Sequence, residues 1–151
     1  MNALRRWLCG ALLAVLAAGA AAEDMLMVRS RAAFEESMMV LQQAISDQGY
    51  TLSRVQRVDI GLTEFGYKTD MYRVVFFGRP EEIRDLSARY PELIPYLPLQ
   101  IAIFAEGDET LLAAASPLDL SAAYANSELD KVFARWERDI RAIMEQVRQA
   151  E

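Results

Sequence analysis

Residues 71–82 read MYRVVFFGRPEE, and this stretch decides the fold. Its first part is dominated by valine and aromatic residues, which are enriched in β-strands. Pro80 suits the first position of a helix, and the two acids after it suit the positive end of that helix. We therefore predict a strand over residues 71–77 that leads into a helix reaching about Tyr90, where Pro91 stops it.

The chain before this stretch predicts a strand, a helix and a second strand. Residues 25–28 form a short apolar run that is typical of a strand. Ser30 is a suitable N-cap for the helix, and Gly49 is well placed to end it. Apolar residues recur between them at helical spacing, at Phe34, Met38, Leu41 and Ile45. The apolar positions over residues 55–60 predict the second strand.

The chain after it predicts a hairpin and two helical segments. Residues 95–98 read PYLP and predict a rigid, extended connector before a strand over residues 99–105. An acidic turn at residues 106–109 then leads into a hairpin partner over residues 110–115. We expect a short helical turn within residues 117–124.

The last helix is the most strongly amphipathic segment. We expect Ser127 to cap it. Its apolar stripe has the spacing of one helix face and consists of Leu129, Val132, Phe133, Trp136, Ile140, Ile143 and Val147. We interpret the charged residues between positions 135 and 141 as the solvated face. The stripe either docks on the protein's own sheet or forms a partner interface.

The element order is therefore strand, helix, strand, strand, helix, strand, strand, helix. This alternation with hairpins predicts an α+β fold: one mostly antiparallel sheet with helices packed on a face. The first six elements have the ferredoxin-like order, and a C-terminal helix follows them. We find no internal repeat or linker, so we expect residues 23–151 to form a single domain.

Residues 1–22 have the organisation of a cleavable signal peptide. A positive start at Arg5 and Arg6 precedes an uncharged apolar run, and small residues before Glu23 fit an A-x-A cleavage pattern. The uncharged run is shorter than the about 20 residues that a membrane-spanning helix needs. We therefore expect residues 23–151 to be periplasmic or secreted, with no stable membrane anchor after cleavage.

Composition excludes several classes of function. The chain has a formal net charge of −6, which becomes −8 without residues 1–22, because these hold two arginines and no acid. We therefore expect no nucleic-acid partner. There is no histidine, and the one cysteine, Cys9, lies in the signal peptide. We expect no cofactor and no metal, because only oxygen ligands remain and the acidic turn at residues 106–109 supplies too few of them for Ca²⁺.

The segment from Gly61 to Asp70 is the candidate functional loop. It concentrates glycines, aromatics and one of only two lysines between two predicted strands. We predict that Glu64, Tyr67 and Lys68 bind a ligand there, assisted by Arg73. The alternative is a hairpin with a polar tip.

Residues from about 30 to 120 resemble the DUF302 family, a bacterial domain of unknown function. Five segments carry the resemblance: GYK at 66–68, RVVFFGRP at 73–80, PYLPLQI at 95–101, EGD at 106–108 and SP at 116–117. Two features depart from many members. An Asp-His pair is missing around residues 61–70, and Gln100 stands where a lysine is common. The resemblance implies an α+β domain that forms a homodimer, and it implies no established substrate.

Our leading functional hypothesis is an exported, non-catalytic binding or accessory module. It would act through an apolar groove or a protein interface, on an unknown protein partner or on a small anionic or apolar ligand. The alternative is a histidine-free enzyme that uses carboxylate, Lys68 or tyrosine chemistry. Converging side chains of Glu64, Lys68 and Arg73 in a concave pocket would favour the enzyme, and a flat apolar surface would favour the interaction module.

Overall fold

The computed structural model describes residues 25–69 and 71–150, and the signal peptide predicted at residues 1–22 lies outside them. The strands form one five-stranded sheet in the order β1-β5-β4-β3-β2, and every neighbouring pair is antiparallel. The strands are β1 (Met25–Ser30), β2 (Thr51–Arg57), β3 (Tyr72–Gly78), β4 (Leu99–Glu106) and β5 (Glu109–Ala115). The predicted α+β class with a mostly antiparallel sheet is confirmed.

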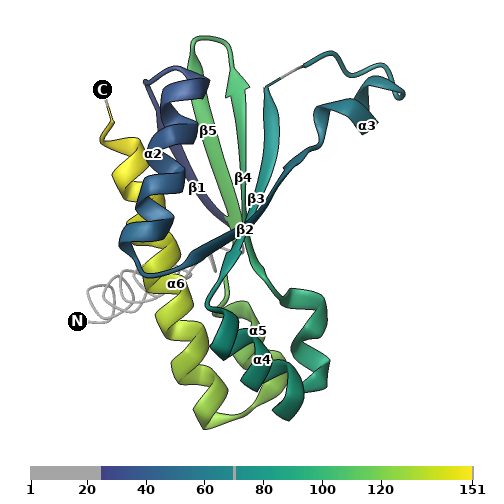
Figure 1. Cartoon of the computed structure of the whole chain (residues 1–151), viewed down its shortest axis with the longest axis vertical. Helices are drawn as coiled ribbons and strands as arrows, with labels where there is room; N and C mark the ends of the chain where they lie inside the picture. The colour runs from purple at the N-terminus through teal and green to yellow at the C-terminus, as the bar shows by residue number, and fades with distance from the viewer. Residues whose placement is uncertain (1–24, 70, 151) are drawn as a thin grey trace, which may run out of the picture.

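Two long helices cover one face of this sheet. They are α2 (Phe34–Asp47) and the C-terminal α6 (Ser127–Arg148), which pack against each other (Figure 1). The shorter helices are α3 (Asp59–Thr63), α4 (Pro80–Arg89), the 3₁₀ helix η1 (Pro91–Tyr96) and α5 (Asp119–Tyr124). Of these, α3 projects from one end of the sheet, and α4 and α5 lie at the other end (Figure 1). None of the helices within the described ranges has both the length and the apolar character needed to span a membrane.

The core lies between the sheet and these two helices. Alternate strand residues point into it, and the fully buried ones are Val75, Phe77, Ile101, Ile103 and Leu112. Helix α6 meets them with its predicted stripe, buried at Leu129, Phe133, Trp136, Ile140, Ile143 and Val147. Each such side chain stabilises the fold by about 1.5–3 kcal/mol when it leaves water.

The opposite face of the sheet is covered by neither long helix (Figure 1). Its central row runs across four strands through Met27, Ala113, Ala102 and Val74, which pair in register. None of these four side chains is charged, and Met27 is 56% exposed. The sheet therefore presents an apolar row at the centre of the side away from its helices, and we call this side the open face.

Two predicted helix caps are wrong. Ser30 is the last residue of β1, and its buried hydroxyl oxygen accepts hydrogen bonds from Ala32 N and Ser37 Oγ. The helix begins only at Phe34. At α6 the cap is Asn126, because its Oδ1 accepts from Glu128 N and Leu129 N, and Ser127 is the first helical residue.

Two predicted segment boundaries also differ. The second strand spans Thr51–Arg57 rather than residues 55–60, because the chain turns into α3 directly after it. The segment before β4 is a 3₁₀ turn up to Tyr96 rather than extended chain, and only Leu97 has extended dihedral angles at its end.

The charged face predicted for α6 is partly buried. Glu137 is 5% exposed and Asp139 is 8% exposed. Each carboxylate is buried with a partner, since Glu137 accepts from Ser116 Oγ and Arg141, and Asp139 accepts from Tyr50 Oη. Buried charges need such partners to offset the loss of water, and sequence spacing alone does not reveal them.

Candidate functional site

The predicted loop site is an exposed projection in the structure. Glu64, Tyr67 and Lys68 are all exposed, on the segment between α3 and β3. Within the described residues, no hydrogen bond or ion pair joins any of these three side chains to another or to Arg73. None of the four lines either of the two cavities described below. The loop site remains a prediction.

Arg73 instead contacts a buried aspartate. Its Nη1 donates to Asp59 Oδ1 at 2.8 Å, and Arg57 donates to the other carboxylate oxygen. Asp59 is only 3% exposed, at the start of α3. The guanidinium of Arg57 above all, together with that of Arg73, holds the pKa of the Asp59 carboxyl below its ordinary value. This cluster fastens α3 to the ends of β2 and β3.

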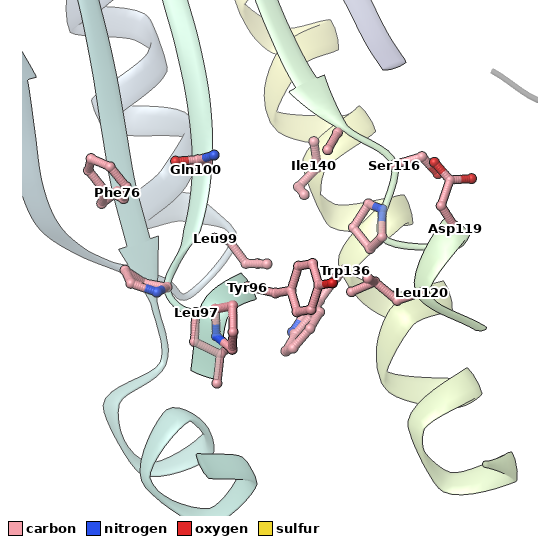
Figure 2. A pocket seen from close by; sticks show the side chains of 14 residues that line it. Phe76, Tyr96, Leu97, Leu99, Gln100, Ser116, Asp119, Leu120, Trp136 and Ile140 are labelled. Atoms are coloured by element: carbon pink, nitrogen blue, oxygen red, sulfur yellow. The ribbon is translucent and has the colours of Figure 1, made fainter. Parts of the chain in front are cut away.

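One of two cavities arises because the neighbouring strands β4 and β5 diverge. The ladder between β4 and β5 ends at Ala102 and Ala113. Beyond that point β4 continues beside β3, where Leu99 pairs with Phe77. In the same region β5 continues beside β1, where Ala115 pairs with Met25. The sheet therefore opens between β4 and β5 at this end (Figure 2).

The opening holds a pocket of about 360 Å³, within the size range of small-molecule sites. Figure 2 shows Leu97 and Leu99 on one side of the space, Ser116 and Leu120 on the other, and Trp136 between them. The lining is Phe76, Pro95, Tyr96, Leu97, Pro98, Leu99, Gln100, Ala115, Ser116, Pro117, Asp119, Leu120, Trp136 and Ile140. Apolar side chains predominate, and a few polar groups stand among them.

Two hydrogen-bonded carboxylates fix the walls of this pocket. Glu82 accepts from Trp136 Nε1 at 3.2 Å and pairs with Arg135, which orients the indole ring. On the other side Glu137 accepts from Ser116 Oγ at 2.7 Å. No described side-chain polar atom that is fully buried lacks a hydrogen-bond partner. The walls are therefore held by satisfied polar contacts, which favour a preformed site.

A second cavity of about 590 Å³ lies between β1 and α6. It is lined by Met25–Val28 and by Arg141, Ala142, Met144 and Glu145. Met25, the first described residue, belongs to this lining, and the lining holds no aromatic side chain. The aromatic-lined pocket between β4 and β5 is therefore the better candidate site, and we call it the strand-end pocket.

The acidic turn between β4 and β5 forms ion pairs with an arginine. Glu106 and Glu109 both pair with Arg29 of β1, which the antiparallel register places beside them. Within residues 25–69 and 71–150, no three histidine, cysteine, aspartate or glutamate side chains gather closely enough to hold a metal ion.

Sequence reasoning missed the strand-end pocket, although it had one usable signal. Three of the five prolines, Pro95, Pro98 and Pro117, line it from two segments that are distant in sequence. Proline at a strand boundary marks a place where ladder pairing stops. That two such places face each other depends on the pairing of β4 and β5, which no local pattern reveals.

Comparison with solved structures supports the fold. The chain is similar to a protein described as "Crystal structure of uncharacterized conserved protein DUF302 from Bacillus stearothermophilus", with 17% identity and a TM-score of 0.73. The match covers 84% of this chain and 100% of that one. No match was found among curated proteins. Residues 26–147 match the family described as "Domain of unknown function DUF302", so the chain belongs to the DUF302 family.

Proposed function

We propose that this protein is an exported, non-catalytic binding module that holds a small apolar ligand in the strand-end pocket. The divergence of β4 from β5 beyond Ala102 and Ala113 is the observation that carries the proposal. It creates an apolar cavity with fixed walls at one end of the sheet. Apolar pockets with a few polar groups are the usual form of small-molecule sites.

The pocket can be tested with a filling variant. Ala115 is exposed and lines the pocket, so Ala115→Phe places a ring in the cavity. Ala88 is also exposed, on α4 and outside the lining, so Ala88→Phe is the matched control. The uncharged probe is 1-octanol, and Trp136 fluorescence reports its binding.

Trp136 can serve as the reporter because a chain that begins at Glu23 keeps it as its sole tryptophan. Such a chain also retains every described helix and strand. We expect Ala115→Phe to raise the Kd for 1-octanol at least about tenfold, and Ala88→Phe to leave it within about twofold. Absence of binding to the unaltered chain, or equal effects of the two variants, would refute the pocket as the site.

Export is the second part of the proposal, and it rests on the signal-like pattern of residues 1–22. N-terminal sequencing of the protein from the periplasm or medium should begin at Glu23. An intact Met1 on membrane-bound protein would contradict cleavage.

We also propose that the protein self-associates through the open face. Its central row of Met27, Ala113, Ala102 and Val74 is uncharged, so two acidic copies meet there with little repulsion. The two alanines let a second sheet approach closely, and such packing removes apolar surface from water. A second copy is therefore the occupant that best fits this surface.

A further inference from the structure

The polar side chains around the strand-end pocket offer acceptors at Ser116 and Asp119, and donors at the Gln100 amide and the Tyr96 hydroxyl. Pro95, Pro98 and Pro117 have no backbone N–H to donate, and the Pro117 carbonyl already accepts from Leu120 N. The Ser116 hydroxyl donates its proton to Glu137 Oε2 at 2.7 Å, so only its lone pairs remain for a ligand. Asp119 adds a carboxylate, which only accepts when ionised. A ligand that supplies donors therefore finds acceptors at Ser116 and Asp119.

The charge of the lining also favours a ligand that supplies hydrogen-bond donors. The fourteen lining residues include one carboxylate, Asp119, and no lysine or arginine. Of the arginines nearby, Arg135 pairs with Glu82 and Arg141 pairs with Glu137. Arg54 is the register partner of Phe76 on β2 and lies outside the lining. Asp119 is exposed, and within the described part of the chain no salt bridge involves its side chain. A positive group on a ligand therefore finds a carboxylate in this lining, and a negative group finds no cation among the lining residues.

Aromatic rings add to this preference. Phe76, Tyr96 and Trp136 belong to the lining. The faces of such rings attract cations, and tryptophan attracts them most strongly. Apolar surface from Leu97, Leu99 and Ile140 surrounds the same space and suits a hydrocarbon body.

From these three observations we infer that the strand-end pocket binds apolar molecules that carry a positive charge, such as hydrophobic amines. This inference rests on the proposed function, and it replaces the expectation of an anionic ligand. The apolar body lies against Trp136, Leu97 and Leu99. The ammonium group lies toward Asp119 and Ser116.

Three probes with the same hydrocarbon chain test the charge preference. Octylammonium is positive at pH 7, 1-octanol is neutral, and octanoate is negative. Each is titrated below its micelle concentration into the chain that begins at Glu23, with Trp136 fluorescence as the readout. We expect octylammonium to bind most tightly, and octanoate to bind about tenfold more weakly than octylammonium.

Charge variants at exposed positions assign the preference to the pocket. Asp119→Asn should reduce the ratio between octylammonium and octanoate about two- to fivefold. Asp108→Asn removes the same charge at the hairpin tip, at the other end of β4, and should leave the ratio unchanged. Gln100→Lys places a cation in the lining and should shift the preference toward octanoate.

The outcomes distinguish the proposal that the pocket binds apolar ligands from the inference that it prefers positively charged ones. Binding of 1-octanol without preference for octylammonium over octanoate would overturn the ligand class and leave the apolar pocket standing. Equal effects of Asp119→Asn and Asp108→Asn would also overturn the ligand class, because the preference would then come from overall charge. If none of the three probes binds, the pocket function itself fails. Circular dichroism of each variant shows that the fold is retained.

Discussion

The phenol of Tyr50 donates a 2.7 Å hydrogen bond to Asp139, a carboxylate that lies 89 residues later on α6. Tyr50 follows the glycine turn after α2, so the contact joins that turn to the C-terminal helix. Arg79 completes the arrangement, since its guanidinium lies 4.4 Å from the centre of the Tyr50 ring and 3.7 Å from Asp139 Oδ2. Three separate segments therefore meet at one buried charge.

Tyr50→Phe is expected to lower the free energy of unfolding by about 1–2 kcal/mol, because the buried carboxylate loses a donor while the ring is kept. Urea denaturation at pH 7 measures the loss. Tyr67→Phe removes an exposed hydroxyl and is the matched control, with a change within about 0.5 kcal/mol. Equal effects of the two substitutions would show that the Tyr50 hydrogen bond adds nothing.

The same contact predicts a loss of stability at alkaline pH. Burial, and then the hydrogen bond to Asp139, raises the pKa of the Tyr50 phenol above its ordinary value of 10.0. The folded state then holds this proton more tightly than the unfolded state. The contribution to stability is complete below pH 10 and decreases as the pH rises above it. Tyr50→Phe should show a shallower decline above pH 10, and identical slopes would contradict the assignment.

The Asp59 carboxyl predicts a loss of stability at acid pH, whereas the Tyr50 phenol predicts a loss at alkaline pH. The pKa of its carboxyl is lowered in the folded state, chiefly by Arg57. Its contribution is therefore complete above the ordinary value of 3.8 and is lost as the pH falls through the lower folded value. Urea midpoints of Asp59→Asn should depend less on pH below 4 than those of the unaltered protein.

The acid measurement needs one matched control. Arg148 lowers the pKa of Glu145 to about 2, so Glu145 also contributes to the acid slope. That contribution is present in both proteins, and the difference between them isolates Asp59. Asp108→Asn, at an exposed turn, should keep the full slope of the unaltered protein. An unchanged slope in Asp59→Asn would show that the cluster with Arg57 and Arg73 is not maintained in solution.

Self-association predicts a defined change in mass. Light scattering should give about twice the monomer mass for the chain that begins at Glu23. Val74→Glu places a charge in the central row of the open face, and we expect it to yield monomers because the charge would lose its water at the interface. Met39→Glu places the same charge on an exposed site of α2 and should leave the mass unchanged. A monomeric unaltered protein at high concentration would refute the interface.

The loop between α3 and β3 gives a prediction that separates stability from binding. Tyr67→Ala combined with Lys68→Ala should change the free energy of unfolding by less than about 0.5 kcal/mol, because both side chains are exposed. If the loop binds a partner, the double variant should lose capture of that partner from periplasmic extract. Capture equal to that of the unaltered protein would mean that the loop is only a projecting turn.

Much of the fold could be predicted because local chemistry agreed with it. The valine and aromatic residues of residues 71–77 predicted β3, and Pro80 is the first residue of α4. Gly49 has a φ of +74° directly after α2, a conformation that glycine adopts without strain and that ends helices. In each case the conformation is determined by the residue itself and by its neighbours within a few positions of the sequence.

The predictions that failed depend on distant partners. Ser30 has the chemistry of a helix cap, yet pairing of β1 with β5 keeps it in the strand. Glu137 was assigned to the solvent, yet Ser116 and Arg141 allow it to be buried. The candidate loop was chosen for its glycines and its scarce lysine, whereas the pocket is formed by a divergence of strands. The pocket residues come from four regions of the chain that only the tertiary structure brings together.

The strand order has a consequence for the way the chain is made. The first strand to be synthesised, β1, lies at one edge of the sheet and pairs with β5. Residues 25–30 therefore cannot pair in the sheet until residues 110–115 have been synthesised. A chain that crosses a membrane starting from its N-terminus cannot complete this sheet until most of its length has passed. The strand order thus delays closure of the sheet, and this delay is compatible with the export proposed above.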